Sequence, residues 1–182
     1  QIQKEMQSNL VKGIEDCIIS LFDELSAQYS WYDTSKNIHY FNGWATNKAW
    51  IINKKVILPY INAWGRYDGK YNPTGYELIK KLSDIEKALN YLDGGRLSDG
   101  MSLSTAMENA QLEGTTKNIR CKFFDITFFK KGTCHIVFRD DELLKKLNIF
   151  GSQQKGWLPQ DYGRKAYNEM TQAEKTVIDS FE

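Results

Sequence analysis

The chain has few of the residues that build metal centres and covalent frameworks. Its 182 residues include only three cysteines and two histidines, and no two cysteines have CxxC spacing. An odd number of cysteines without that spacing indicates a reducing compartment rather than a disulfide framework. So few candidate ligands also leave little from which to build a structural zinc site. We therefore expect neither a metal nor a cofactor.

Long apolar runs and common enzyme signatures are missing as well. No uninterrupted apolar run approaches the roughly 20 residues of a membrane helix, and the first residues, "QIQKEMQSNL", lack a signal-peptide layout. We expect an intracellular protein with no membrane partner. The sequence contains no GxxxxGKS/T, no GxGxxG after a strand, no GxSxG and no HExxH. Because it starts without Met and stops within a helical pattern, we also expect a fragment of a longer protein.

The bulk composition is that of a globular protein with many aromatic residues. Hydrophobic residues make up 41%, aromatic residues 13% and charged residues 26% of the chain. This length and balance predict a single domain over residues 1–182 with a sizeable core. Because the net charge is only +1, any binding to a polyanion must come from local clusters of charge.

Apolar residues recur at helical spacing in several segments, and the pattern between those segments favours strands. We therefore predict an α+β fold in which an antiparallel sheet, including a hairpin at about 118–138, packs against several amphipathic helices. The expected helices span about residues 3–28, run from a cap at Thr74 to Gly94, span 104–112, follow a cap at Asp140, and begin at a capping box, Thr171 to Glu174.

The segment "FFDITFFKKGTCHIVF" predicts a hairpin whose turn decides which side chains share a face. Lys130–Gly132 suits a three-residue turn with Gly132 in the left-handed region. This register puts the apolar side chains on one face and Asp125, Thr127 and His135 on the other. A two-residue turn would place His135 in the core, so we favour the three-residue register.

Asp125 and His135 are the only catalytic candidates that this hairpin offers. The register makes them diagonal neighbours, and an Asp near a His can orient the ring and raise its basicity, as in a general base. The sequence shows no nearby nucleophile. Most histidines on a polar face do no chemistry, so we interpret His135 as a structural or recognition residue.

Residues 34–67 carry five positive charges and no Asp or Glu, interleaved with many aromatic residues. An Asn42–Gly43 turn and "AWIINKKVIL" predict one strand or two short paired strands there. Cations that meet phosphates and rings that stack on bases are typical of nucleic-acid binders, although the same rings could instead fill the core. The candidate contacts are Lys48, Lys54, Lys55 and Arg66 with Trp44, Trp50 and Trp64, and a second cluster comprises Lys117, Arg120, Lys122, Lys130 and Lys131.

Four stretches, "NIRCKFFDITFFKKGTCHIVF", "LLKKLN", "NKAWIINKKVILP" and "GWLPQDYGRKAYNEMTQAEKTVIDSFE", resemble the bacterial and phage domain-of-unknown-function family 4942. The resemblance runs from about residue 10 to the end of the chain. That family lies in phages, plasmids and conjugative elements, often C-terminal to a DNA methyltransferase domain. The resemblance implies a protein of the bacterial cytoplasm with an accessory or target-recognition role on DNA, and it supplies no catalytic residues.

These observations leave three hypotheses for the function. The first is a non-catalytic domain that binds DNA beside a methyltransferase domain. The second is a phage-encoded anti-defence or regulatory protein that binds a host defence protein through exposed Trp and Tyr side chains. The third is a metal-independent or nuclease-like enzyme that uses Asp125 and His135.

Overall fold

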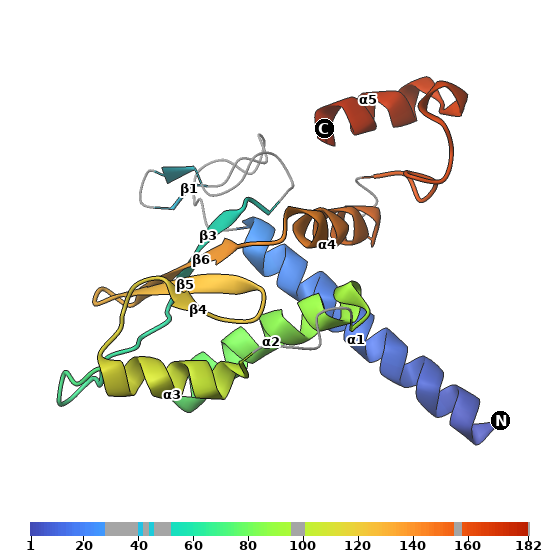
Figure 1. Cartoon of the computed structure of the whole chain (residues 1–182). Coiled ribbons are helices and arrows are strands. Elements are labelled where there is room, and N and C mark those ends of the chain that lie inside the picture. The colour runs from blue at the N-terminus through green and yellow to red at the C-terminus, as the bar shows by residue number, and fades with distance from the viewer. Residues whose placement is uncertain (28–39, 42–43, 46–51, 96–100, 155–157, 182) are drawn as a thin grey trace.

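The computed structural model describes residues 1–27, 40–41, 44–45, 52–95, 101–154 and 158–181 (Figure 1). Helices and an antiparallel sheet occur together, which confirms the expected α+β class. In chain order the elements are α1 (Ile2–Ala27), β1 (Tyr40–Phe41), β2 (Trp44–Ala45), β3 (Lys55–Pro59), α2 (Tyr76–Asp93), α3 (Leu103–Glu113), β4 (Ile119–Arg120), β5 (Phe124–Phe129), β6 (Thr133–Phe138), α4 (Asp141–Gln154), the short 3-10 helix η1 (Tyr167–Glu169) and α5 (Gln172–Phe181).

Side-chain caps begin two of the helices where the sequence predicts them. The Asp140 carboxylate accepts a hydrogen bond of 3.1 Å from the backbone N–H of Leu143 at the start of α4. Thr171 and Glu174 form the predicted capping box before α5, since each side chain accepts a bond from the backbone N–H of the other residue. These bonds satisfy N–H groups that have no partner inside the helix.

The start of α2 differs from the prediction. The Thr74 hydroxyl donates a 2.6 Å hydrogen bond to Asn72 Oδ1, and the Asn72 side chain also accepts a bond from the Thr74 backbone N–H. The N-cap position falls on Gly75, which has no side chain to cap with, so the predicted cap at Thr74 is wrong. The predicted end is confirmed, because Gly94 closes the helix in the left-handed conformation.

Four strands form the main sheet in the order β3-β6-β5-β4, and all neighbouring pairs are antiparallel. The β5–β6 register pairs Phe129 with Thr133, Thr127 with His135 and Asp125 with Val137, which confirms the three-residue turn. One face of these strands is buried and the other is only half covered. The buried side chains are Val56, Leu58, Phe124, Ile126, Phe128, Cys134, Ile136 and Phe138.

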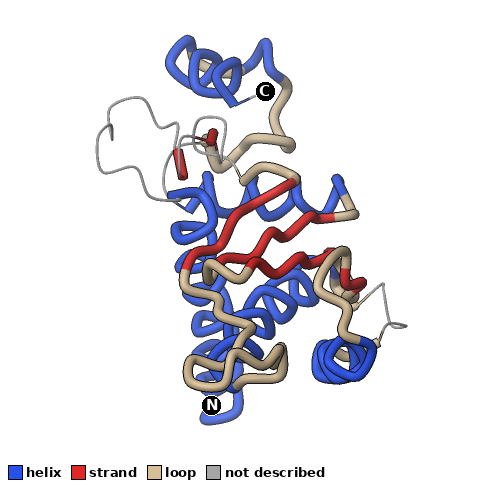
Figure 2. Tube along the Cα trace, turned by 90° about the vertical axis from the view of Figure 1, so that its left-hand side faces the viewer, coloured by secondary structure: helices blue, strands red, loops and turns tan. Residues whose placement is uncertain are grey.

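The buried face shares one hydrophobic core with α1, α2, α3 and α4. Figure 2 shows these strands in red with helices in blue behind them. Asn148 on α4 also fixes the residues that lead into β3, because its side chain accepts a 2.7 Å bond from Ile52 N–H and donates to the Ile52 carbonyl. The half-covered face, which we call the outer face, carries His135 and Asp125.

Two short strands flank the predicted Asn42–Gly43 turn, because Tyr40–Phe41 pairs with Trp44–Ala45; residues 42–43 themselves lie outside the described chain. Within "AWIINKKVIL", residues 49–51 also lie outside it, and the described part contains one strand, β3, at the edge of the main sheet. None of the described helices is long and apolar enough to cross a membrane.

Two parts of the chain extend from the main core. In Figure 1 the first half of α1 projects away from the sheet, toward the N-terminus. At the other end of the chain, Leu158, Met170 and Ile178 form a small separate cluster, with Ile149 of α4 packed against it. α5 is joined to α4 through this cluster.

Candidate nucleic-acid interface

The turn between β5 and β6 presents two lysines at the end of the sheet. Gly132 has a φ of 89°, which glycine adopts without strain, and its N–H donates a 3.0 Å bond to the Phe129 carbonyl. The Gly132 carbonyl in turn accepts a 3.0 Å bond from the N–H of Ile61. The turn is therefore held in place, while Lys130 and Lys131 are exposed at its tip.

Tyr60 places an exposed ring directly beside that turn. It follows Pro59, which pairs with Thr133, and precedes Ile61, which bonds to Gly132. The Tyr60 side chain is 91% exposed, and its φ of 59° is uncommon for a residue other than glycine. Strained backbone and a fully exposed aromatic ring at one position are typical of a recognition site rather than of packing.

His135 lies behind the tip on the outer face, between Thr127 of β5 and Ile57 of β3. Its ring packs against Phe129 with 4.4 Å between ring centroids and an interplanar angle of 47°. Burial, followed by the positive charges of Lys55 and Lys131, lowers the pKa of His135 below its usual value of 6.5. The ring is therefore mainly neutral at pH 7, and the charges acting on it are those of cations.

We call Tyr60, Phe129, Lys130, Lys131 and His135 the tip surface. Among the described residues, neither Lys130 nor Lys131 has a carboxylate partner. The surface thus combines two exposed positive charges, an exposed ring and a neutral imidazole packed on a second ring. This composition can bind a phosphate and stack on a base.

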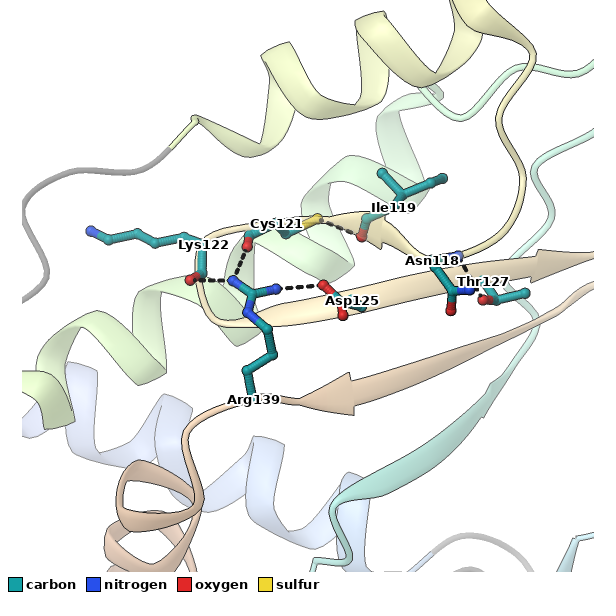
Figure 3. A network of polar contacts seen from close by, with 7 residues as sticks. All are labelled: Asn118, Ile119, Cys121, Lys122, Asp125, Thr127 and Arg139. Carbon is teal, nitrogen blue, oxygen red and sulfur yellow. Dashed lines mark hydrogen bonds and ion pairs between the residues drawn. The ribbon is translucent and has the colours of Figure 1, made fainter.

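The other end of the outer face is closed by Arg139 (Figure 3). One guanidinium nitrogen, Nη1, lies 2.5 Å from Asp125 Oδ1. The other, Nη2, donates to the carbonyls of Cys121 and Lys122, at 2.8 Å in the second case. Arg139 therefore ties the tight turn between β4 and β5 to the end of β6.

This arrangement changes the interpretation of Asp125 and His135. Asp125 faces Val137, so His135 on β6 and Arg139, directly after β6, are its diagonal neighbours, one on each side. The carboxylate pairs with Arg139, and the pKa of His135 moves down rather than up because of burial and nearby lysines. The geometry therefore gives no support to the hypothesis that Asp125 raises the basicity of His135.

Arg139 could have been found from the sequence. Extending the predicted register by one residue past Phe138 puts Arg139 on the face that holds Asp125, at the same spacing as His135 on the other side. Because a guanidinium carries a permanent charge and several donors, it competes for a carboxylate better than a neutral imidazole does.

Two of the predicted phosphate contacts are bound within the chain. Lys54 lies 3.1 Å from Asp141 in the first turn of α4. Lys122 donates a 2.7 Å hydrogen bond to Asn90 of α2, and its ammonium group lies 5.3 Å from the centre of the Phe123 ring. Both lysines point away from the tip surface toward helices, so they are weaker candidates than Lys130 and Lys131.

The remaining predicted cations lie around the sheet without joining the tip surface. Lys55 is exposed on β3 and contributes its charge at His135. Arg120 is exposed on β4 opposite Asp125, at the closed end. Arg66 is exposed on a loop closed by a bridge between Trp64 and Tyr71.

Of the three tryptophans predicted to stack on bases, only Trp64 has a described side chain. Trp64 is half-buried against the core and lies 5.3 Å from the Tyr71 ring, so it fills the core rather than offering a stacking surface. The side chains of Trp44 and Trp50, and all of Lys48, lie outside the described part of the chain. The two most exposed rings among the described residues are Tyr60 and Tyr67, the latter 97% exposed, which sequence reasoning did not select. The available signal for Tyr60 was Pro59, because Pro commonly marks an edge or end of a strand.

No group of three or more potential metal ligands occurs in the part of the chain that the structure describes. A cleft of about 870 Å³ lies between the β4–β5 turn and the start of α4. Its charged side chains have both signs, so it does not select for an anion. They are Asp93, Arg120, Lys122, Arg139, Asp140, Asp141 and Glu142.

Comparison with known proteins identifies the family. The family described as "Domain of unknown function (DUF4942)" matches residues 1–157. No curated protein and no solved structure matches the chain. The match begins earlier than the resemblance noted in the sequence and ends before the C-terminal cluster, and it covers the whole main sheet and α1 to α4. The chain belongs to the DUF4942 domain family.

Proposed function

We propose that this domain binds DNA through the tip surface and catalyses no reaction by itself. The observation that carries the proposal is the meeting of Lys130, Lys131 and the exposed Tyr60 ring at one end of the sheet, beside His135. Two of the five residues are cations and three are rings, which is the combination that binds a phosphate backbone and its bases together.

The geometry favours contact with exposed bases over reading of a duplex groove. The tip is a tight turn tied to a strand end, and none of the described helices projects from it. Tyr60 presents an entire ring face to solvent, which suits stacking on an unpaired base. Single-stranded or locally opened DNA is accordingly the expected ligand.

The resemblance of the sequence to mobile-element proteins sets the expected context. We place this domain in the bacterial cytoplasm as an accessory or target-recognition unit beside a DNA methyltransferase or another DNA-modifying enzyme. In such a pairing the partner supplies the chemistry, and the tip surface would hold the strand near it.

A charge reversal with a matched control tests the proposal. Lys130→Glu/Lys131→Glu should weaken binding of a fluorescent single-stranded oligonucleotide by at least tenfold at low salt. It should also make the salt dependence shallower by about 1 in slope per lost phosphate contact. Lys145→Glu/Lys146→Glu, on exposed positions of α4, changes the net charge equally and should leave most of the affinity. Equal loss in both variants, or no binding by the unaltered chain, would refute the proposal.

A second function is favoured by the loop that follows Tyr60. Arg66 and Tyr67 are both exposed there, and Tyr and Arg are enriched among the residues that dominate protein interfaces. A phage-encoded anti-defence or regulatory protein could bind a host protein with this loop. Retrieval of one host protein after nuclease treatment, lost with Tyr67→Ala and kept with Lys130→Glu/Lys131→Glu, would favour this function over DNA binding.

A further inference from the structure

The outer half of α1 exposes an apolar row that nothing in the described chain covers. Ile2, Met6 and Leu10 lie four residues apart on one face of the helix, and Met6 and Leu10 are 66% and 67% exposed. Apolar side chains of α1 reach the core only from Ile14 and Ile18 onward. Figure 1 shows the same segment projecting from the body of the molecule.

A helix segment of this kind is not expected to be stable without packing. Isolated helices shorter than about 12–15 residues are marginal in water. Gly13 lies between the projecting half and the packed half, and glycine disfavours helix in such an interior position. A partner surface would supply the missing packing.

A groove of about 760 Å³ begins where the exposed row ends. It lies between α1 and α2, and its α1 side includes the small residues Gly13, Cys17 and Ser20 among larger ones such as Leu10 and Leu21. An ion pair between Lys81 and Glu24 lies at its inner end. The exposed row and the groove therefore form one continuous surface along a single helix.

We propose that two copies of the chain form an antiparallel dimer in which the outer half of each α1 lies in the α1–α2 groove of the other copy. One row of side chains on α1 advances by alternating steps of four and three residues, the spacing of a helix–helix seam. It comprises Met6, Leu10, Gly13, Cys17 and Ser20. The side chains in the outer half of that seam are large and those in the inner half are small. An antiparallel second copy therefore places the large side chains of one chain against the small ones of the other.

A single register of the two helices brings large side chains opposite small ones in both halves of the seam. When Leu10 lies opposite Gly13 of the other copy, Met6 lies opposite Cys17, and the same contacts repeat across the two-fold axis. The surface is self-complementary, and this is why we favour a second copy over an unrelated helix.

Sedimentation equilibrium at micromolar concentrations tests the dimer. The unaltered chain should approach twice the 21.1 kDa of one chain. Gly13→Leu should return the mass to that of one chain, and it should not disturb the single chain because nothing lies within 4 Å of a Cβ at that position. Leu10→Asp should act likewise, whereas Leu112→Asp on α3, at a position 85% exposed, should keep the dimer. A single-chain mass throughout, or a dimer that survives Leu10→Asp, overturns the proposal.

Cross-linking tests the antiparallel register. The native Cys17 is exposed, while Cys121 and Cys134 are buried, so Met6→Cys should form a disulfide between two chains when diamide oxidises the two thiols. Ser8→Cys, on another side of α1, should remain a single chain on a non-reducing gel, as should Met6→Cys/Cys17→Ser. Absence of the Met6→Cys cross-link while sedimentation still shows a dimer would overturn this register.

Discussion

The two ends of the outer sheet face make opposite use of charge. Around Arg139, a carboxylate and two backbone carbonyls surround one guanidinium, so the charge of this side chain is matched within the chain. At the tip surface, Lys130 and Lys131 have no such partner among the described residues, and the charge of Lys131 acts on a neutral histidine. The first end holds strands and turns together, and the second leaves its charges available for a ligand.

The difference follows from what each end connects. Arg139 joins β6 to the turn between β4 and β5, which a sheet of short strands needs because β4 pairs over only two residues. The hairpin tip is already held by backbone bonds from Gly132, so its side chains are not needed for that purpose. Changes at the closed end should therefore alter stability, and changes at the tip surface should alter binding.

The largest expected effect comes from opening the closed end. Arg139→Met removes the ion pair and the bonds to two carbonyls, leaving Asp125 half-buried and unpaired. Losing one partner of a fully buried pair costs about 3–5 kcal/mol, and partial exposure of both side chains should reduce the loss here to about 2–3 kcal/mol. Urea unfolding measures this loss of stability. Arg120→Met, an exposed neighbour on the same face, should change stability by less than about 0.5 kcal/mol, and an equal loss in both variants would contradict the assignment.

A smaller effect of opposite sign is expected beside the tip surface. Thr133 is buried beside Gly132, and among the described residues its hydroxyl has no hydrogen-bond partner. Thr133→Val keeps the shape and removes the unsatisfied group, so the free energy of unfolding should rise by about 1 kcal/mol. Thermal unfolding shows whether the variant is more or less stable than the unaltered chain. A clear loss of stability would show that the hydroxyl is bonded in solution.

The smallest effect concerns pH. The pKa of His135 is lower in the folded chain than its usual 6.5, so the unfolded chain binds more protons between these two values. Stability from this group is fully present above about pH 6.5 and is lost as pH falls through the folded pKa. His135→Gln should reduce this dependence in urea unfolding measured on both sides of pH 6.5. An unchanged pH profile would assign the acid sensitivity to other groups.

Much of the fold could be predicted because its signals are local. The capping box before α5, the Asp140 cap and the Lys130–Gly132 turn each depend on a few neighbouring residues. The register of the hairpin followed from the separation of apolar and polar side chains alone. Thr74 was misassigned because Asn72, two residues earlier, offered its side chain a closer partner than the helix did.

The candidate site was harder to predict because charge depends on distant partners. The sequence shows Lys54 and Lys55 as equals, yet only the structure brings Asp141 to the first and His135 to the second. Likewise Trp64 is an ordinary aromatic in sequence and becomes a core residue once Tyr71 lies against it. Tyr60 gained its importance from a bond between its neighbour Ile61 and the far hairpin.

The most direct test of DNA binding at the tip surface is the pKa of His135, followed by NMR of its ring protons with and without a saturating single-stranded oligonucleotide. The chain has two histidines, so His135→Gln assigns the signal. Phosphates near Lys131 and Lys55 would offset the charges that now lower this pKa, so we predict that it rises on binding. A His135 pKa that stays unchanged while the oligonucleotide is fully bound would contradict the account.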